Sequence, residues 1–135
     1  MVEIKSVYEG QLHCNATHGP SGAVLATDAP KDNMGKGEAF SPTDLVATAL
    51  GTCMLTTMGI VARDRGWDIA GATAHVEKEM GSTPRRHIAK LTMALTMSKG
   101  LDATAREVLE ETARTCPVAS SIGNTIELDL SFRYV

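Results

Sequence analysis

Alternation of apolar and polar residues along the chain predicts six β-strands. Each segment has period-two patterning and is bounded by turn-forming residues such as Gly, Pro, Asn or Ser. The expected strands are residues 2–8, 11–18 and 23–28 near the start, 72–80 and 87–97 in the middle, and 126–134 at the end. The two middle strands flank a turn that contains Pro84, so we expect them to form a hairpin.

An apolar segment in the middle of the chain predicts one long helix, residues 42–65. Ser41 is a favourable N-cap, and Asp44 follows it at the spacing of a capping box, where it also places negative charge in the first turn. Gly66 comes directly after a basic last turn and is a natural C-terminal stop. The boundaries of this helix are therefore well marked by the sequence.

The long helix is apolar on every face, because no charged residue occurs from Leu45 to Ala62. Such a helix must be covered on all sides. It reaches roughly 36 Å, whereas a compact chain of this size has a radius of gyration of only about 14 Å. A second subunit is the simplest cover, so we expect a homodimer with this helix near the interface. The alternative is a single sheet wrapped around the helix.

Two shorter helices complete the pattern. Asp102 is expected to cap a helix that ends near Thr115, and Cys116 with Pro117 interrupts it and opens a short helix over 117–122. The whole order is then β-β-β-α-β-β-α-α-β. This order is typical of an α+β fold and not of regular βαβ repeats. At 135 residues, the chain fits a single domain spanning residues 1–135.

Composition and charge exclude several classes of function. The net charge of −3 and a pI near 5.8 argue against a nucleic-acid-binding surface. No window has the roughly 20 uncharged apolar residues of a membrane span. The first ten residues alternate and carry charge, unlike a signal peptide. We therefore expect a cytoplasmic protein that binds neither nucleic acid nor a membrane, and nothing indicates a cofactor.

The chain has three cysteines, which do not indicate a disulfide scaffold in a chain without an export signal. Zinc ligands usually occur in closely spaced pairs, but Cys14, Cys53 and Cys116 are far apart. His13 and His18 near Cys14 form the only local cluster, and a strand would send residues 13 and 14 to opposite faces. We expect no metal site, and we assign no role to Cys14.

Cys116 and Cys53 lie in different chemical settings. Cys116 is expected at a helix N-terminus, which should lower the pKa of its thiol. Cys53 lies in mid-helix, where the N–H groups are already paired, so composition alone favours a structural role for it. If Cys53 is reactive, its thiolate needs a charge from elsewhere. The polar loop 29–40 is the obvious source, and its only cations are Lys31 and Lys36.

Two stretches of the sequence resemble the osmotically inducible protein C and organic hydroperoxide resistance (OsmC/Ohr) family. They are "SPTDLVATALGTCMLTTM" around Cys53 and "RTCPVASSI" around Cys116. The stretches "SGAVLATDAP", "GKGEAFSPTDL" and "VEKEM" look like the general OsmC-like branch. The resemblance covers nearly the whole chain. It implies an OsmC-like fold and an intertwined homodimer with the cysteine-bearing helix in the centre.

The resemblance also implies a thiol-dependent peroxidase. Cys53 would attack an organic hydroperoxide, release an alcohol and become a sulfenic acid, with which Cys116 would condense to a disulfide. An external thiol or dithiol would then reduce that disulfide. The implied role is peroxiredoxin-like defence against oxidative and osmotic stress. Two alternatives stay open: a non-enzymatic OsmC-like ligand-binding protein, and a thiol redox sensor.

The sequence departs from the family at two positions near the expected site. Characterised members place an Arg from the N-terminal half beside the peroxidatic thiolate, whereas this chain has no Arg before Arg63. Thr43 also stands where those members have Glu. We expect Lys36 or Lys31 to supply the positive charge and Glu38 to orient it.

Overall fold

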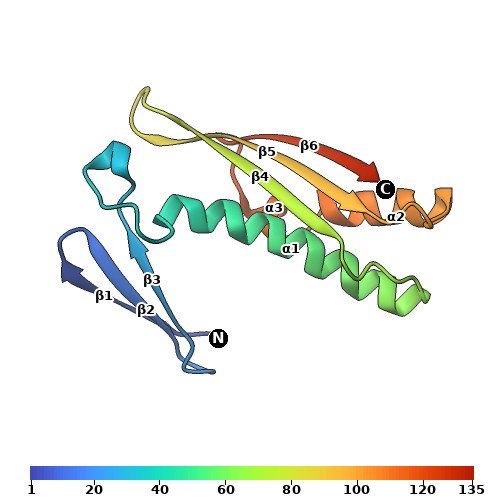
Figure 1. Cartoon of the computed structure of the whole chain (residues 1–135), viewed down its shortest axis with the longest axis horizontal. Helices are drawn as coiled ribbons and strands as arrows, with labels where there is room; N and C mark the ends of the chain where they lie inside the picture. The colour runs from blue at the N-terminus through green and yellow to red at the C-terminus, as the bar shows by residue number, and fades with distance from the viewer. The chain divides into compact units, whose positions relative to one another are not determined.

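The secondary-structure elements follow one another in the order β-β-β-α-β-β-α-α-β, as predicted, with one additional turn of 3₁₀ helix (Figure 1). The computed structural model describes residues 1–135, the whole chain. The chain divides into an N-terminal unit, Met1–Val46, and a C-terminal unit, Ala47–Val135. The fold is of the α+β class, with one three-stranded sheet in each unit.

The N-terminal unit contains an antiparallel sheet in the order β1-β2-β3. Its strands are β1 Ile4–Gly10, β2 His13–His18 and β3 Val24–Asp28, and the 3₁₀ turn η1 follows at Lys31–Asn33. The first two strands begin two residues later than predicted. The reason is that Gln11 and Leu12 adopt left-handed backbone conformations, with φ of 52° and 61°, and form the turn between the strands.

The β1-β2-β3 sheet has one largely apolar face, whereas its opposite face mixes Val7, Val24 and Ala26 with polar residues. The strand register places Ile4, Tyr8 and Leu25 on the apolar face, together with Cys14 and Ala16. Ile4, Tyr8 and Leu25 are 66%, 63% and 46% exposed. The buried residues of this unit are all polar, namely Thr27, Asp28 and Ser41. The N-terminal unit therefore has no apolar core of its own.

The long helix α1, Pro42–Arg65, has the predicted boundaries. The hydroxyl of Ser41 accepts a hydrogen bond from the backbone N–H of Asp44 at 3.1 Å, and the Asp44 carboxylate accepts one from the N–H of Ser41 at 2.9 Å. This is the reciprocal capping box. At the other end, Gly66 has a φ of 74°, and Trp67 N donates to the carbonyl of Ala62 at 2.8 Å. The left-handed Gly stops the helix.

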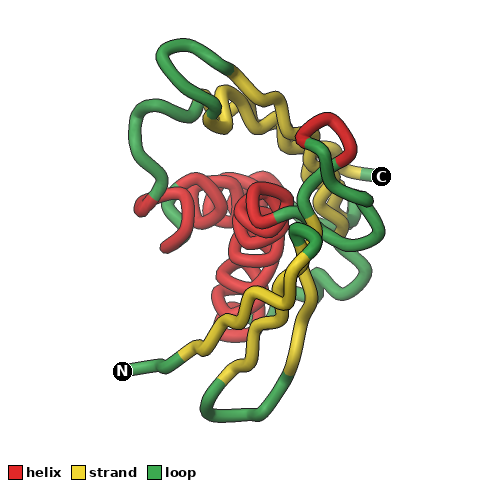
Figure 2. The backbone as a smooth tube through the Cα atoms, turned by 90° about the vertical axis from the view of Figure 1, so that its left-hand side faces the viewer, coloured by secondary structure: helices red, strands yellow, loops and turns green.

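The C-terminal unit is built around a second sheet in the order β4-β5-β6. The strands β4 Thr73–Gly81 and β5 His87–Met97 form the predicted antiparallel hairpin, whereas β6 Glu127–Tyr134 pairs with β5 in parallel. A parallel pair needs a crossover connection. Here α2 Ala103–Arg114 and α3 Pro117–Ser121 provide it, and in Figure 2 the helices of this unit lie on one side of its own three strands.

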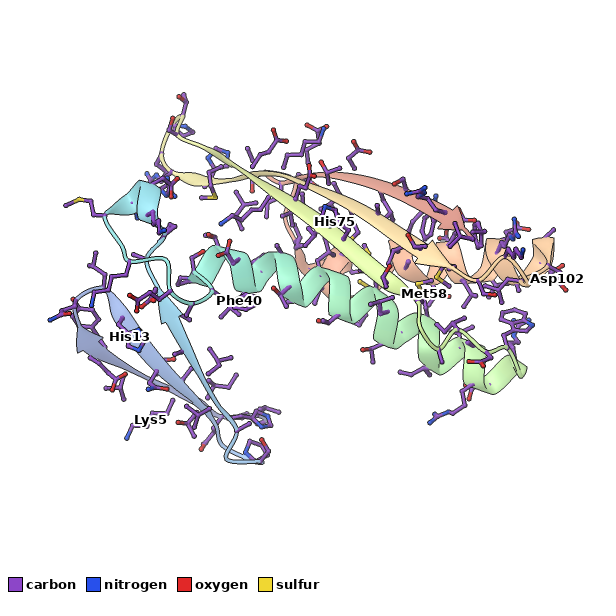
Figure 3. The ribbon with its side chains drawn as sticks, in the orientation of Figure 1. Lys5, His13, Phe40, Met58, His75 and Asp102 are labelled. Carbon is purple, nitrogen blue, oxygen red and sulfur yellow. The ribbon has the colours of Figure 1, made fainter.

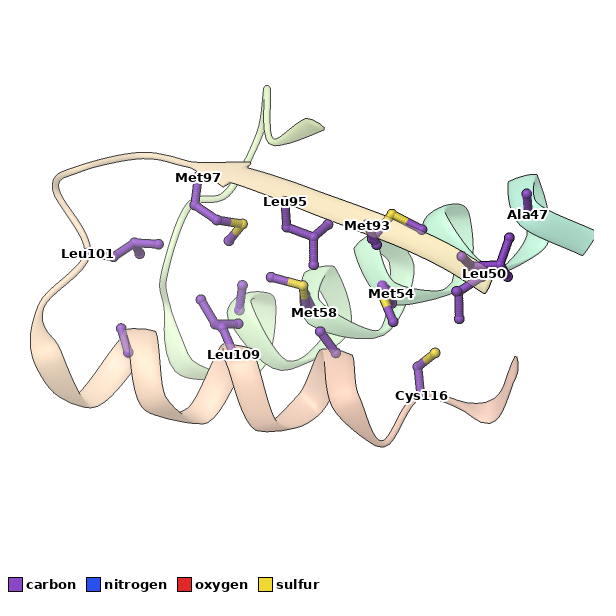
Figure 4. Close-up of a cluster of buried hydrophobic side chains, with 14 of the residues drawn as sticks. Ala47, Leu50, Met54, Met58, Met93, Leu95, Met97, Leu101, Leu109 and Cys116 are labelled. Atoms are coloured by element: carbon purple, nitrogen blue, oxygen red, sulfur yellow. The ribbon is translucent and has the colours of Figure 1, made fainter. Parts of the chain in front are cut away.

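The apolar core of the chain lies entirely in the C-terminal unit, between α1, the inner face of β5 and α2 (Figure 4). Helix α1 contributes one stripe of buried residues at helical spacing to this core: Ala47, Leu50, Met54, Met58 and Ala62. The other buried apolar side chains are Ile88, Leu91, Met93, Leu95, Met97, Leu101, Ala105, Leu109, Ala113 and Cys116. Cys53, Leu55 and Val61 on the flanks of this stripe are partly buried against the core, whereas Val46 and Ile60 on other faces of α1 are exposed.

Helix α1 is also long and apolar enough to cross a membrane, with a mean hydropathy of 1.8 over 18 residues. No such segment was predicted from the sequence, because no window of about 20 residues is both uncharged and apolar throughout. Core helices of soluble proteins meet the same test of length and hydropathy. The packing of one α1 stripe against β5 and α2 is the arrangement of a core helix.

Candidate thiol site

Cys53 lies in the middle of α1, between the buried side chains of Leu50 and Met54. Its side chain is half-buried and packs against the apolar core. The backbone carbonyl of Cys53 accepts a hydrogen bond from the Thr57 hydroxyl at 2.9 Å. The helix therefore holds Cys53 on the flank of the buried stripe, where one side of its thiol faces the core.

Cys116 forms the junction between α2 and α3. It has an extended backbone, with φ of −60° and ψ of 155°, and is the N-cap of α3, whose first residue is Pro117. Its sulfur accepts a hydrogen bond from the backbone N–H of Ala119 at 3.4 Å. Cys116 is buried, and its side chain points toward the part of α1 that carries Leu50 and Met54 (Figure 4). The predicted N-cap position is confirmed.

The structure brings the Cys53 and Cys116 side chains together within the C-terminal unit. The Cys53 side chain lies close enough to the Cys116 thiol to raise its pKa, although their positions in the sequence are far apart. All three cysteines of the chain are free thiols. Proximity of the two side chains is the first condition for a disulfide between them.

Burial raises the pKa of the Cys116 thiol, and the hydrogen bond and charge of the Cys53 side chain raise it further. The N–H groups of Ala119 and Val118 act in the opposite direction, as a helix N-terminus should, but they are outweighed. The expectation of a lowered pKa for Cys116 is therefore wrong. The helix terminus was correctly placed, but the cost of burying a charge could not be read from local sequence.

The supporting residues expected near the thiols all belong to the N-terminal unit. Lys36 and Glu38 line the same polar cavity of about 400 Å³, and the Lys36 amine donates to the side-chain carbonyl of Gln11 at 3.2 Å. Lys31 does not line this cavity. Its side chain instead packs over Gly37, where an added Cβ would lie 3.0 Å from Lys31 Cγ and where the φ of 63° favours glycine. The role of these residues beside Cys53 stays a prediction.

Sequence reasoning missed a buried carboxylate in the same polar cavity. Asp28, at the end of β3, accepts a hydrogen bond from His13 Nδ1 of β2 at 2.5 Å and another from the backbone N–H of Glu38 at 3.1 Å. The hydrogen bond from His13 holds the pKa of the Asp28 carboxyl below its usual range. Figure 3 shows where His13 lies on the sheet. The pairing depends on the register between β2 and β3, which no local pattern encodes.

This chain is similar in sequence and in fold to known proteins. A family model described as OsmC-like protein matches residues 35–131. The chain is 47% identical to a Psychrobacter arcticus protein, provisionally described as an osmotic stress induced and detoxification response protein. This match covers 98% of this chain and 96% of that one, with a TM-score of 0.92. No curated protein matches the chain.

More distant structures share the fold. An organic hydroperoxide resistance protein OsmC from Legionella pneumophila is 19% identical over 98% of this chain and 96% of its own, with a TM-score of 0.79. A Vibrio cholerae protein, provisionally described as an organic hydroperoxide resistance protein, carries captopril in one of its active sites. It is 17% identical, with a TM-score of 0.78, over 100% of this chain and 92% of its own.

Proposed function

The chain belongs to the OsmC-like protein family, and from this premise we propose that it is a thiol-dependent peroxidase that reduces organic hydroperoxides to alcohols. The observation that carries the proposal is the contact between the side chains of Cys53 and Cys116. Two thiols held together beside an apolar core suit a two-cysteine redox cycle. The proposed physiological role is defence against oxidative and osmotic stress.

In the first step, the Cys53 thiolate attacks the distal oxygen of the hydroperoxide ROOH. The O–O bond breaks, the alkoxide takes up a proton and leaves as the alcohol ROH, and Cys53 becomes a sulfenic acid. Cys53 is the better placed of the two thiols for this attack, because its side chain is half-buried whereas Cys116 is fully buried. The apolar neighbours Leu50 and Met54 favour substrates with an apolar substituent over hydrogen peroxide.

In the second step, the Cys116 sulfur attacks the Cys53 sulfenic sulfur. An S–S bond forms, and hydroxide leaves as water with the proton from the Cys116 thiol. The raised pKa of Cys116 keeps this thiol protonated in the resting protein, so it does not compete for hydroperoxide. Proximity offsets its low thiolate fraction once Cys53 is oxidised. An external thiol or dithiol then reduces the disulfide and is itself oxidised.

The supporting residues remain as proposed from the sequence. Lys36 is our first candidate for the positive charge that stabilises the Cys53 thiolate, with Lys31 as the second and Glu38 as the group that orients the amine. Within the N-terminal unit, the Lys36 amine donates to the Gln11 side-chain carbonyl at 3.2 Å. A Lys36→Gln variant should oxidise more slowly at Cys53, and an unchanged rate would remove Lys36 from the mechanism.

We also propose a cytoplasmic homodimer in which residues 1–135 form one domain. The support for the dimer is the apolar surface that this chain leaves open: Ile4, Tyr8 and Leu25 on the N-terminal sheet, and Val46 and Ile60 on α1. Large exposed apolar patches mark interaction sites. The support for the cytoplasm is that free thiols persist in a reducing compartment.

Stopped-flow oxidation of the reduced protein by cumene hydroperoxide tests the proposed function. We expect the wild type to react orders of magnitude faster than free cysteine, Cys53→Ser to lose this reaction, and Cys116→Ser to keep the first step but stop at the sulfenic acid. Cys14→Ser is the matched control and should react like the wild type.

Consumption of cumene hydroperoxide no faster than by free cysteine would exclude a peroxidase. Fast oxidation that no dithiol reverses would favour a redox sensor, and binding without oxidation would favour a ligand-binding protein.

A further inference from the structure

A second cavity, of about 430 Å³, lies in the C-terminal unit and includes neither thiol in its lining. Its size is within the usual range of small-molecule sites, about 300–1,000 Å³. The lining residues come from α1, β5, β6 and the last residue of α2. They are Leu50, Met54, Leu91, Met93, Leu128, Leu130, Arg114 and Asp129. We call it the β6 pocket.

The inner walls of the β6 pocket are apolar. Leu50, Met54, Leu91 and Met93 are almost completely buried, so the pocket borders the dry core of the unit. The two Met side chains are flexible and can adapt to the shape of an occupant. Leu128 is 39% exposed and therefore lies at the mouth. Such a pocket can take an alkyl chain and exclude water from it.

The charge on the β6 pocket is concentrated in one side chain. The Asp129 carboxylate forms an ion pair with the Lys90 amine at 3.6 Å. Side chains alternate along a strand, so Asp129 lies on the opposite face of the sheet from Leu128 and Leu130. Asp129 can therefore contribute only backbone to the pocket. Arg114 is the remaining charged residue of the lining.

Arg114 is held in position but is not saturated with partners. Its guanidinium stacks over the ring of Phe132 at 5.0 Å and lies 3.7 Å from Glu110 Oε1. The other Glu110 oxygen accepts a hydrogen bond from the Tyr134 hydroxyl at 2.9 Å. The Arg114 side chain is still 48% exposed. Several of its N–H donors are therefore free to bind an anion, and their planar arrangement matches a carboxylate.

We propose that the β6 pocket binds a free monocarboxylate with a linear alkyl chain. The chain lies between Met54, Met93 and Leu130, and the carboxylate meets the Arg114 guanidinium at the mouth. The pocket shares Leu50 and Met54 with the surroundings of Cys53, but neither thiol lines it and the ligand needs no peroxide group. A neutral or cationic head group on the same chain would gain the apolar contacts but not the ion pair with Arg114.

Isothermal titration calorimetry with decanoate, decanol and decyltrimethylammonium tests the proposal. The protein carries Cys53→Ser and is kept reduced, so that redox chemistry at the thiol pair plays no part. We expect saturable binding of one decanoate per chain, at least about tenfold tighter than decanol and tighter still than the cation. The absence of saturable decanoate binding, or equal affinity for all three amphiphiles, would overturn the proposal.

Two substitutions locate the binding to the β6 pocket. Arg114→Gln should weaken decanoate binding about tenfold while leaving decanol binding unchanged. Its matched control is Arg106→Gln, because Arg106 also lies on α2 and stacks on an aromatic ring of β6, Tyr134, at 4.1 Å, but does not line the pocket. Leu128→Trp should weaken both ligands by filling the mouth. Equal losses in the Arg114 and Arg106 variants, or no loss with Leu128→Trp, would place the ligand elsewhere.

Discussion

The two units of the chain use their apolar residues in opposite ways. The C-terminal unit, Ala47–Val135, buries all fifteen side chains of the core, whereas the N-terminal unit, Met1–Val46, buries only three polar residues and exposes its larger apolar side chains. Burial of apolar surface is the main stabilising contribution to folding. The C-terminal unit can therefore stabilise itself, but the N-terminal sheet needs a surface to cover it. The thiol pair belongs to the C-terminal unit, and the polar cavity at His13 and Asp28 belongs to the N-terminal unit.

The largest expected effect of a single substitution is in the core of the C-terminal unit. Leu91→Ala removes a completely buried side chain from β5, and we expect it to lower the free energy of unfolding by about 2–5 kcal/mol through lost burial and a cavity. Urea denaturation measures the change. Leu128→Ala is the matched control, because Leu128 is paired with Leu91 in the sheet but is partly exposed, and should cost clearly less. Equal losses would contradict the assignment of stability to this core.

The second prediction concerns the open face of the N-terminal sheet. If a second chain covers the apolar face that carries Tyr8 and Leu25, Leu25→Asp should raise the dissociation constant of the dimer about 100-fold or more, because it buries a charge. Sedimentation velocity over a range of protein concentrations measures this constant. Val24→Asp, on the same strand but the opposite face, should leave the dimer intact. If both variants stay dimeric or both dissociate, the apolar face that carries Tyr8 and Leu25 is not the dimer interface.

The third prediction uses the raised pKa of Cys116, which is a consequence of burial in the C-terminal unit. The thiolate is the reactive form, so a raised pKa means that reactivity appears only at more alkaline pH. In a Cys14→Ser, Cys53→Ser variant, alkylation by iodoacetamide should have its midpoint above about pH 8.5, the ordinary value for cysteine. Each unit of upward shift reduces the thiolate fraction at neutral pH about tenfold.

The same variant unfolded in urea provides the control for this measurement. Its midpoint should return to the ordinary value, since unfolding removes the burial that causes the shift. A folded-state midpoint at or below that of free cysteine would mean that the helix N-terminus dominates over burial after all.

The smallest expected effect is at Tyr134 on β6. Burial and the hydrogen bond to Glu110 raise the pKa of Tyr134 to about 12, from an unfolded value of 10. Because the folded-state pKa is the higher one, the stabilisation is fully present below pH 10 and is lost as the pH rises toward 12. Tyr134→Phe should cost about 1 kcal/mol at neutral pH. It should also remove the most alkaline step from the tyrosine titration followed by ultraviolet absorbance; retention of that step would contradict the assignment.

Local patterns predicted most of the fold. The capping box at Ser41 and the stop at Gly66 gave both ends of α1, and alternation gave the β4-β5 hairpin to within about a residue. The strands of the N-terminal unit were less accurate, because the turn at Gln11 and Leu12 uses left-handed conformations that are uncommon for these residues. The parallel pairing of β5 with β6 was not expected, since a register between distant strands depends on packing and not on sequence periodicity.

The candidate site was predictable only in part. Cys53 and Cys116 could be singled out as a pair only by family resemblance, because mid-helix position and composition alone favoured a structural role for Cys53. The pKa of Cys116 and the pairing of His13 with Asp28 both depend on burial and on contacts across strands. Such contacts are tertiary, and no spacing in the sequence encodes them.

The most direct test of the central claim is a single-turnover oxidation followed by peptide mapping. The reduced protein receives one equivalent of cumene hydroperoxide, free thiols are blocked after increasing times, and the disulfide-linked peptides are identified by mass spectrometry. The proposed two-cysteine cycle predicts that a Cys53–Cys116 disulfide forms as fast as cumyl alcohol appears, while Cys14 stays a free thiol. Formation of alcohol without this disulfide, or a disulfide that includes Cys14, would contradict the proposed cycle.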